Sequence, residues 1–173
     1  MKVEIINRLK KFKVSSKKIN VLFDRLSEFF KIEPRYSITV TFAGIDTMRN
    51  LNRDFRQKDR PTDVLSFPLY DTGTIIMAGD KRGRHDIESG MPLILGDIIL
   101  CPDYILKNNV LEANEKFQYE VLYLLIHGFL HLIGHDHDED DYENSEMKKA
   151  AEKFIKKSIS EKDYQLLLIR GLN

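Results

Sequence analysis

Residues 127–137 read HGFLHLIGHDH. The first part of this stretch lies at the end of a segment, residues 114–133, that is predicted to form a long helix. His127 and His131 stand four residues apart on this helix, so their side chains leave the same face with Cβ atoms about 5–6 Å apart. Gly134 follows, and glycine readily adopts the left-handed conformation that ends a helix and turns the chain. That turn allows His137 to return toward the other two rings. The stretch therefore predicts three imidazoles around one metal ion.

The ligand set indicates which metal is expected and which kind of site it forms. Three protein ligands with an open fourth position make up a catalytic zinc site, whereas structural zinc sites are usually closed by four ligands. Neutral imidazoles leave the whole charge of the ion in place, so the site should hold hydroxide or an anionic oxygen strongly. We expect one Zn²⁺, held by His127, His131 and His137.

Two other histidines are weaker candidates for this site. His135 lies four residues after His131 and would be a ligand if the helix continued, but Gly134 predicts that the helix ends first. His85 lies among charged residues and is expected to be solvated.

The spacing of the three histidines is shared with metzincin proteases, which carry a glutamate directly after the first histidine. That glutamate activates the water on the zinc and shuttles its proton. Here the position is Gly128, so the metal geometry is similar but the general base of a protease is missing. A zinc-dependent hydrolase of peptides or small esters stays an alternative function.

Composition limits the class of protein. The chain has 173 residues with 42% hydrophobic and 31% charged residues, which excludes a disordered protein and fits one compact domain. Its 27 basic and 27 acidic residues give a formal net charge of zero, so an overall basic surface does not argue for nucleic-acid binding. A single cysteine excludes an internal disulfide, and neither a signal peptide nor a membrane helix is evident. We expect a cytoplasmic protein without a membrane partner.

The remaining segments predict a mixture of strands and helices. Strands are expected at residues 3–6, 37–42, 63–67 and 93–100, and helices at residues 16–31, 104–109, 114–133 and 139–158. Ser15 or Ser16 is the expected N-cap of the first helix. A second helix, with Met48 on its inner side, is expected to be capped by Asp46. Residues 69–92 read as a long loop, a kind of segment that is usually functional or mobile.

These elements do not alternate strictly, so the predicted fold class is α+β. We expect a small mixed four-stranded sheet packed with helices, with the zinc site on a helix and the turn that follows it. Residues 1–160 are predicted to form a single metal-dependent domain, and residues 161–173 a C-terminal tail of unknown role.

Basic residues crowd the second helix and the turn after it: Arg49, Arg53, Arg56, Lys58 and Arg60. Most of them are expected to lie on a solvated helix face. However, a guanidinium beside a divalent cation could hold a phosphodiester, because it binds phosphate oxygens in a bidentate manner. An acidic stretch, residues 136–143, follows the histidine motif, and part of it is expected at the start of the last helix.

Two segments together resemble the YbeY family of bacterial rRNA maturation factors, described as single-strand-specific, metal-dependent endoribonucleases. One is LNRDFRQKDRPTDVLSFP, residues 51–68, and the other is the histidine motif with LGDIIL, residues 95–100, before it. The order and spacing of elements fit this family from about residue 3 to residue 157. Two departures are His135, where the family commonly has tyrosine, and the segment 70–91, which is longer than usual.

The resemblance implies zinc on the three histidines and a functionally important Arg56, which we take as the candidate catalytic residue. It also implies a single-stranded or ribosomal RNA substrate, with roles in small-subunit rRNA 3′ end processing and ribosome quality control. The small ribosomal subunit or assembly factors are then the expected partners. A ribosome-assembly factor with a mainly structural zinc stays a second alternative. The general base is left open among hydroxide on the metal, Asp136 and the 2′-hydroxyl of the RNA.

Overall fold

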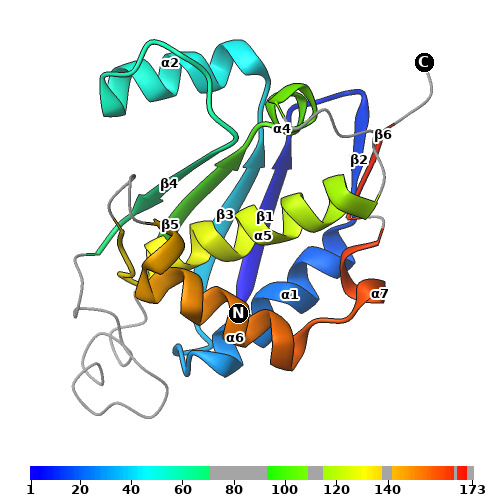
Figure 1. The fold of residues 1–173 in the computed structure, drawn as a ribbon, viewed down its shortest axis with the longest axis vertical. Helices are drawn as coiled ribbons and strands as arrows, with labels where there is room; N and C mark the ends of the chain where they lie inside the picture. Colours follow the sequence, from blue (N-terminus) through cyan, green and yellow to red (C-terminus); the bar gives the residue numbers. More distant parts are fainter. Residues whose placement is uncertain (71–92, 109–114, 138–141, 166, 171–173) are drawn as a thin grey trace.

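The computed structural model describes residues 1–70, 93–108, 115–137, 142–165 and 167–170. Its centre is a mixed four-stranded sheet in the order β1-β3-β5-β4 (Figure 1). Strands β1 (Lys2–Asn7), β3 (Tyr36–Phe42) and β5 (Leu93–Leu100) run parallel, and β4 (Val64–Pro68) runs antiparallel to β5 at the edge. The α+β class and the mixed four-stranded sheet are thereby confirmed.

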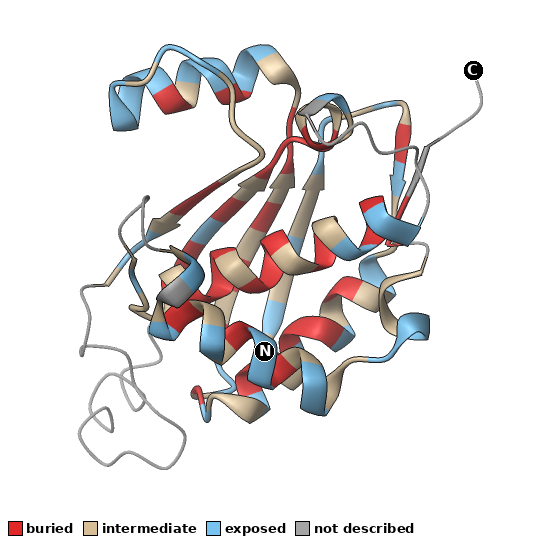
Figure 2. Ribbon diagram, viewed as in Figure 1, coloured by how far each residue is buried: buried red, intermediate tan, exposed pale blue. Residues whose placement is uncertain are grey.

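Helices cover the sheet because its strands carry apolar side chains that are buried in the core. Along β3, buried and half-buried residues alternate, as expected when successive side chains point to opposite faces. One face packs against α1 (Ser16–Phe29) and α5 (Glu115–Leu132), and α6 (Glu146–Ser158) packs on these two helices. Figure 2 shows buried residues along α5 and the sheet. On α2 (Ile45–Arg56), Met48 packs with Leu65 and Cys101 in a smaller cluster of its own.

Gly96 fixes the contact between the two strands nearest the histidines. Its φ is +140°, and a Cβ there would lie 2.1 Å from the carbonyl oxygen of Phe67 on β4. A residue with a side chain would therefore separate β4 from β5. The register of β3 against β5 also shifts between Ser37 and Ile38, opposite this part of β5.

A second, two-stranded sheet joins the two ends of the chain. Strand β2 (Phe12–Val14) pairs antiparallel with β6 (Leu168–Arg170), which follows the short helix α7 (Glu161–Tyr164). Residues 161–170 were expected only as part of a tail, yet Leu167 and Leu168 are buried in the core. Three-residue strands carry too little pattern to be predicted from sequence.

Several expected boundaries differ from the structure. Asp46 is not the N-cap of α2: Gly44 holds that position, and its carbonyl accepts the N–H of Met48 at 3.0 Å. Asp46 lies in the first turn, where its charge still favours the helix. Ser15 is the N-cap of α1, although its side chain makes no capping hydrogen bond.

Two other expected helices also begin elsewhere. Helix α6 starts at Glu146 and not at residue 139, because the hydroxyl of Ser145 caps it by accepting the N–H of Lys148 at 3.1 Å. A 3₁₀ turn, η1 (Tyr142–Asn144), precedes it, and α4 is Pro102–Asn108. Most of the expected loop, residues 71–92 with His85, lies outside the described residues. Within the described part of the chain, every helix is too short or too polar to span a bilayer.

Candidate metal centre

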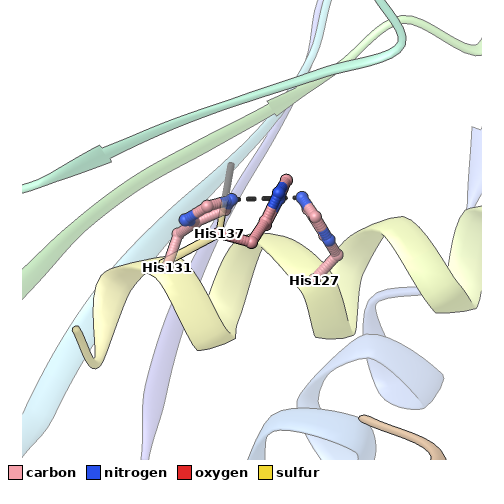
Figure 3. A group of neighbouring side chains, drawn as sticks. All are labelled: His127, His131 and His137. Carbon is pink, nitrogen blue, oxygen red and sulfur yellow. Dashed lines mark hydrogen bonds between the residues drawn. The ribbon is translucent and has the colours of Figure 1, made fainter. Parts of the chain in front are cut away.

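Three imidazole rings meet above the carboxyl-terminal half of α5. His127 and His131 project from the helix and His137 returns beside them (Figure 3). One nitrogen from each ring lies within 4.8 Å of the others, and the two Nε2 atoms of His127 and His131 are 3.1 Å apart. Two nitrogens bound to a tetrahedral zinc ion at 2.0–2.1 Å would be about 3.3 Å apart. The three residues are therefore placed so that they could hold one metal ion.

The turn after α5 brings the third ring into place. Gly134 has a φ of +91°, its N–H donates to the carbonyl of His131 at 3.0 Å, and the next N–H donates to the carbonyl of Leu130 at 2.9 Å. This pair of bonds is the Schellman pattern that ends a helix on a left-handed residue. The carboxylate of Asp136 then accepts the N–H of His137 at 2.9 Å. Local hydrogen bonds thus direct His137 back toward the helix.

His135 lies outside the group of three. Its ring packs edge-on against Phe30, with 6.1 Å between ring centroids, and burial lowers the pKa of the imidazole. The helix has already ended, so the spacing of four residues from His131 does not place this ring on the shared face.

The surroundings favour neutral rings. Burial, together with smaller repulsion from His131, His137 and Arg56, lowers the pKa of His127 to about 3. Burial likewise lowers the pKa of His131, while the nearby Asp136 carboxylate opposes the shift. A histidine binds a metal through its neutral form, so these shifts favour metal binding by His127 and His131.

A cavity of about 550 Å³ lies between these rings and the edge strand β4. Val64, Ser66 and Pro68 line it from β4, and Arg56 lines it from the end of α2. Arg56 is exposed, and its charge is close enough to lower the pKa of His127 and His131.

The structure distinguishes Arg56 from its basic neighbours. Arg49 forms a two-pronged ion pair with Asp59, at 2.8 and 2.7 Å, and Arg53 pairs with Asp54 at 2.9 Å. Both pairs lie on the exposed surface, so these arginines are engaged away from the rings. Among the arginines of α2, Arg56 is the one that lines the cavity with the histidines.

Gly128 is required by packing. A Cβ at this position would lie 2.9 Å from Cγ2 of Ile98 and 3.1 Å from Oγ of Ser66, because α5 approaches the sheet closely here. A glutamate, the residue that metzincin proteases have at this position, would require Ile98 or the helix to shift.

Known proteins are similar in sequence to this chain over most of its length. The sequence model of the family described as "Endoribonuclease YbeY" matches residues 4–159. This chain belongs to the YbeY family. It is 40% identical over 125 residues to an endoribonuclease YbeY of Lysinibacillus sphaericus, covering 72% of this chain and 74% of that protein. It is 37% identical over 128 residues to one of Bacillus cytotoxicus, covering 72% of this chain and 76% of that protein.

A solved structure gives the same result for the fold. The solution structure of a Thermotoga maritima protein superposes with a TM-score of 0.52 at 31% sequence identity. The superposition covers 89% of this chain and 87% of that one. The family expected from residues 51–68 and 127–137 is therefore confirmed.

Two residues at this YbeY site were not anticipated from the sequence. The ring centroid of Tyr142 lies 4.6 Å from that of His137 and 5.2 Å from that of His127. The hydroxyl of Tyr142 forms a hydrogen bond with that of Tyr123. Ser66 lines the cavity from β4. Their places depend on how η1 and β4 pack against α5, which no local sequence pattern reports.

Proposed function

We propose that this chain is a zinc-dependent endoribonuclease that cuts single-stranded RNA, acting in 3′ end maturation of small-subunit rRNA and in ribosome quality control. The observation that carries the proposal is the convergence of three imidazoles beside a cavity lined by Arg56. Family membership supports the same reaction, since the curated relatives are named as endoribonucleases.

The donor set favours zinc over harder cations. His127, His131 and His137 would supply three imidazole nitrogens, whereas magnesium and calcium prefer oxygen ligands. When bound, the ion supplies a Lewis acid for a phosphoryl oxygen. No described carboxylate joins the group of three, so the positive charge at the site would remain available to an anionic substrate.

Arg56 would hold the phosphodiester and stabilise the negative charge that develops in the transition state. Its place in the same cavity as the rings supports this role. Asp136 is a positioning residue in this scheme, since it accepts the N–H of His137 and lies 3.8 Å from Nδ1 of His131. An exposed carboxylate that fixes the turn needs no role in proton transfer.

Neither alternative function gains a specific observation. A peptidase of the metzincin type would need a glutamate at position 128, where the chain has Gly128 and a Cβ would lie 2.9 Å from Cγ2 of Ile98. A purely structural zinc would normally be closed by a fourth protein ligand, whereas a cavity adjoins these three histidines.

A substrate panel tests the proposal. Purified protein should cleave single-stranded RNA, leave casein intact, lose activity in a chelator and regain it with added zinc. Cleavage of casein but not RNA, or RNA cleavage that persists after the metal is stripped, would contradict the proposal.

Arg56→Ala should lower kcat for RNA by about 100-fold or more, with a much smaller change in KM, because the lost interaction forms mainly in the transition state. Arg53→Ala is the matched control: it removes an arginine one turn earlier that pairs with Asp54. Steady-state kinetics and metal analysis of both variants make the measurement. A variant of Arg56 that raised KM and left kcat unchanged would reduce this residue to substrate binding.

A further inference from the structure

The hydroxyl of Ser66 is a buried polar group for which the described part of the protein supplies no partner. The residue is 8% exposed, and its Oγ has no hydrogen bond there. Buried hydroxyls in native proteins are nearly always bonded, because an unsatisfied one destabilises the fold. Such a group next to a functional cavity suggests that its partner comes from outside the chain.

Ser66 lies between the edge strand and the helix that carries the histidines. Its Oγ is 3.1 Å from the point where a Cβ of Gly128 would lie, so it occupies the space that this glycine leaves. The same residue lines the cavity that holds Arg56 and His127. Serine has one side-chain torsion, and two of its rotamers are common in strands, so rotation about one bond redirects the hydroxyl.

The backbone of β4 adds a second donor at this place. The carbonyl of Asp63 accepts from Cys101 at 2.8 Å and the N–H of Leu69 donates to Leu95 at 2.9 Å, so the odd-numbered residues of β4 bond to β5. In an antiparallel pair the residues between them turn their N–H and C=O groups away. The N–H of Ser66 therefore faces the outer edge of β4, the last strand in the described sheet.

The other outward N–H of this strand is already used. Val64 donates its N–H to the carboxylate of Asp63 at 2.8 Å, and Pro68 has no N–H to donate. Ser66 is thus the residue of β4 that offers both a main-chain and a side-chain donor beside the histidines.

We propose that Ser66 forms an anion subsite for the substrate, in which its hydroxyl and N–H donate to a non-bridging phosphate oxygen of a single-stranded RNA. Arg56 provides the positive charge in the same cavity, and the strand of RNA lies along the outer edge of β4. This inference rests on the proposed function and adds to it a binding residue and a place for the backbone of the substrate.

Ser66→Ala tests the subsite by binding rather than by turnover. The probe is a 2′-O-methyl single-stranded oligonucleotide, and its dissociation constant is measured by fluorescence anisotropy on chelator-treated protein. The variant should bind about tenfold more weakly or worse, because hydrogen bonds to charged groups are strong. Its Tm should equal or exceed that of the wild type, since a buried unsatisfied hydroxyl has been removed.

Ser27→Ala is the matched control. Ser27, on α1, is also buried, at 4% exposure, but its hydroxyl donates to the carbonyl of Ile32 at 3.3 Å. This variant should bind the oligonucleotide as the wild type does and have a lower Tm. The subsite is overturned if Ser66→Ala binds within twofold of the wild type, if its Tm falls as that of Ser27→Ala does, or if the wild type binds no oligonucleotide.

Failure of the subsite and failure of the proposed function are distinguishable. Weaker binding by Ser66→Ala supports the subsite even if the wild type cuts no RNA, an outcome that would reject only the nuclease. Wild-type cleavage together with unchanged binding by Ser66→Ala would reject only the subsite.

Discussion

The two ends of α5 differ in whether the buried polar side chains there have hydrogen-bond partners in the described part of the protein. Near its start, Gln118 is 6% exposed, and its amide accepts the N–H of Leu168 at 3.0 Å and donates to the carbonyl of the same residue. Near its end, burial and neighbouring rings hold the pKa of His127 far below its ordinary value, and the hydroxyl of Ser66 nearby lacks a described partner.

We infer that this difference separates a structural end of the helix from the end that carries the candidate metal centre. At the first end the chain satisfies its own donors and acceptors, which fastens β6 to the core. At the second end the same fold keeps neutral imidazoles together, an arrangement that favours a cation supplied from outside. Local conflict with the rules of stable packing is expected at functional sites.

Gln118→Leu should produce the largest change in stability and leave the metal centre intact. The leucine fits a similar volume but leaves both the N–H and the C=O of Leu168 without their partner. The free energy of unfolding should fall by about 2–4 kcal/mol, since each unsatisfied buried group costs about 1–3 kcal/mol. Urea unfolding measures the loss, and zinc titration checks the site.

Gln165→Leu serves as the control for that variant. The side chain of Gln165 makes an exposed hydrogen bond to Glu115 at 3.2 Å, so its replacement should change stability by less than about 0.5 kcal/mol. If both variants lost the same stability, or if Gln118→Leu weakened zinc binding, the two ends of α5 would not be independent.

Acid should destabilise the metal-free protein through the other end of the helix. Burial lowers the pKa of His127 to about 3, whereas the unfolded chain has the ordinary value of about 6.5. The unfolded state therefore takes up the proton first, so stability falls as the pH drops through 6.5 and levels off near 3. Between pH 7 and pH 5 this residue should remove about 2 kcal/mol, measured by urea unfolding in a chelator.

His127→Gln sharpens this second test because glutamine does not titrate. The variant should lose about 2 kcal/mol less than the wild type over the same pH interval. An identical pH dependence in the two proteins would mean that the ring is not held neutral by its surroundings.

Local signals explain what could be predicted from the sequence. The end of α5 just before Gly134 follows from the conformation of that glycine, and the shared face of His127 and His131 follows from the helical period. Both are properties of neighbouring residues. The resemblance of residues 51–68 singled out Arg56, and the ion pairs of Arg49 and Arg53 agree with treating the other arginines as surface residues.

Features that depend on distant contacts could not be predicted. Phe12 of β2 pairs with Arg170 of β6, although nearly the whole sequence lies between them. Each of the two strands has three residues. The assignment of Asp46 as a cap was wrong because the helix begins earlier, at Ile45, which makes Gly44 the N-cap. Tyr142 and Ser66 come close to the histidines only when η1 and β4 pack beside α5.

The most direct measurement is the zinc content per chain of the wild type and of His127→Ala, determined by mass spectrometry after dialysis against trace zinc. We expect one zinc ion per wild-type chain and less than about a tenth of that in the variant, because two remaining imidazoles hold the ion far more weakly. Full zinc occupancy in the variant, or a wild-type protein that retains none, would contradict a metal centre built from these three rings.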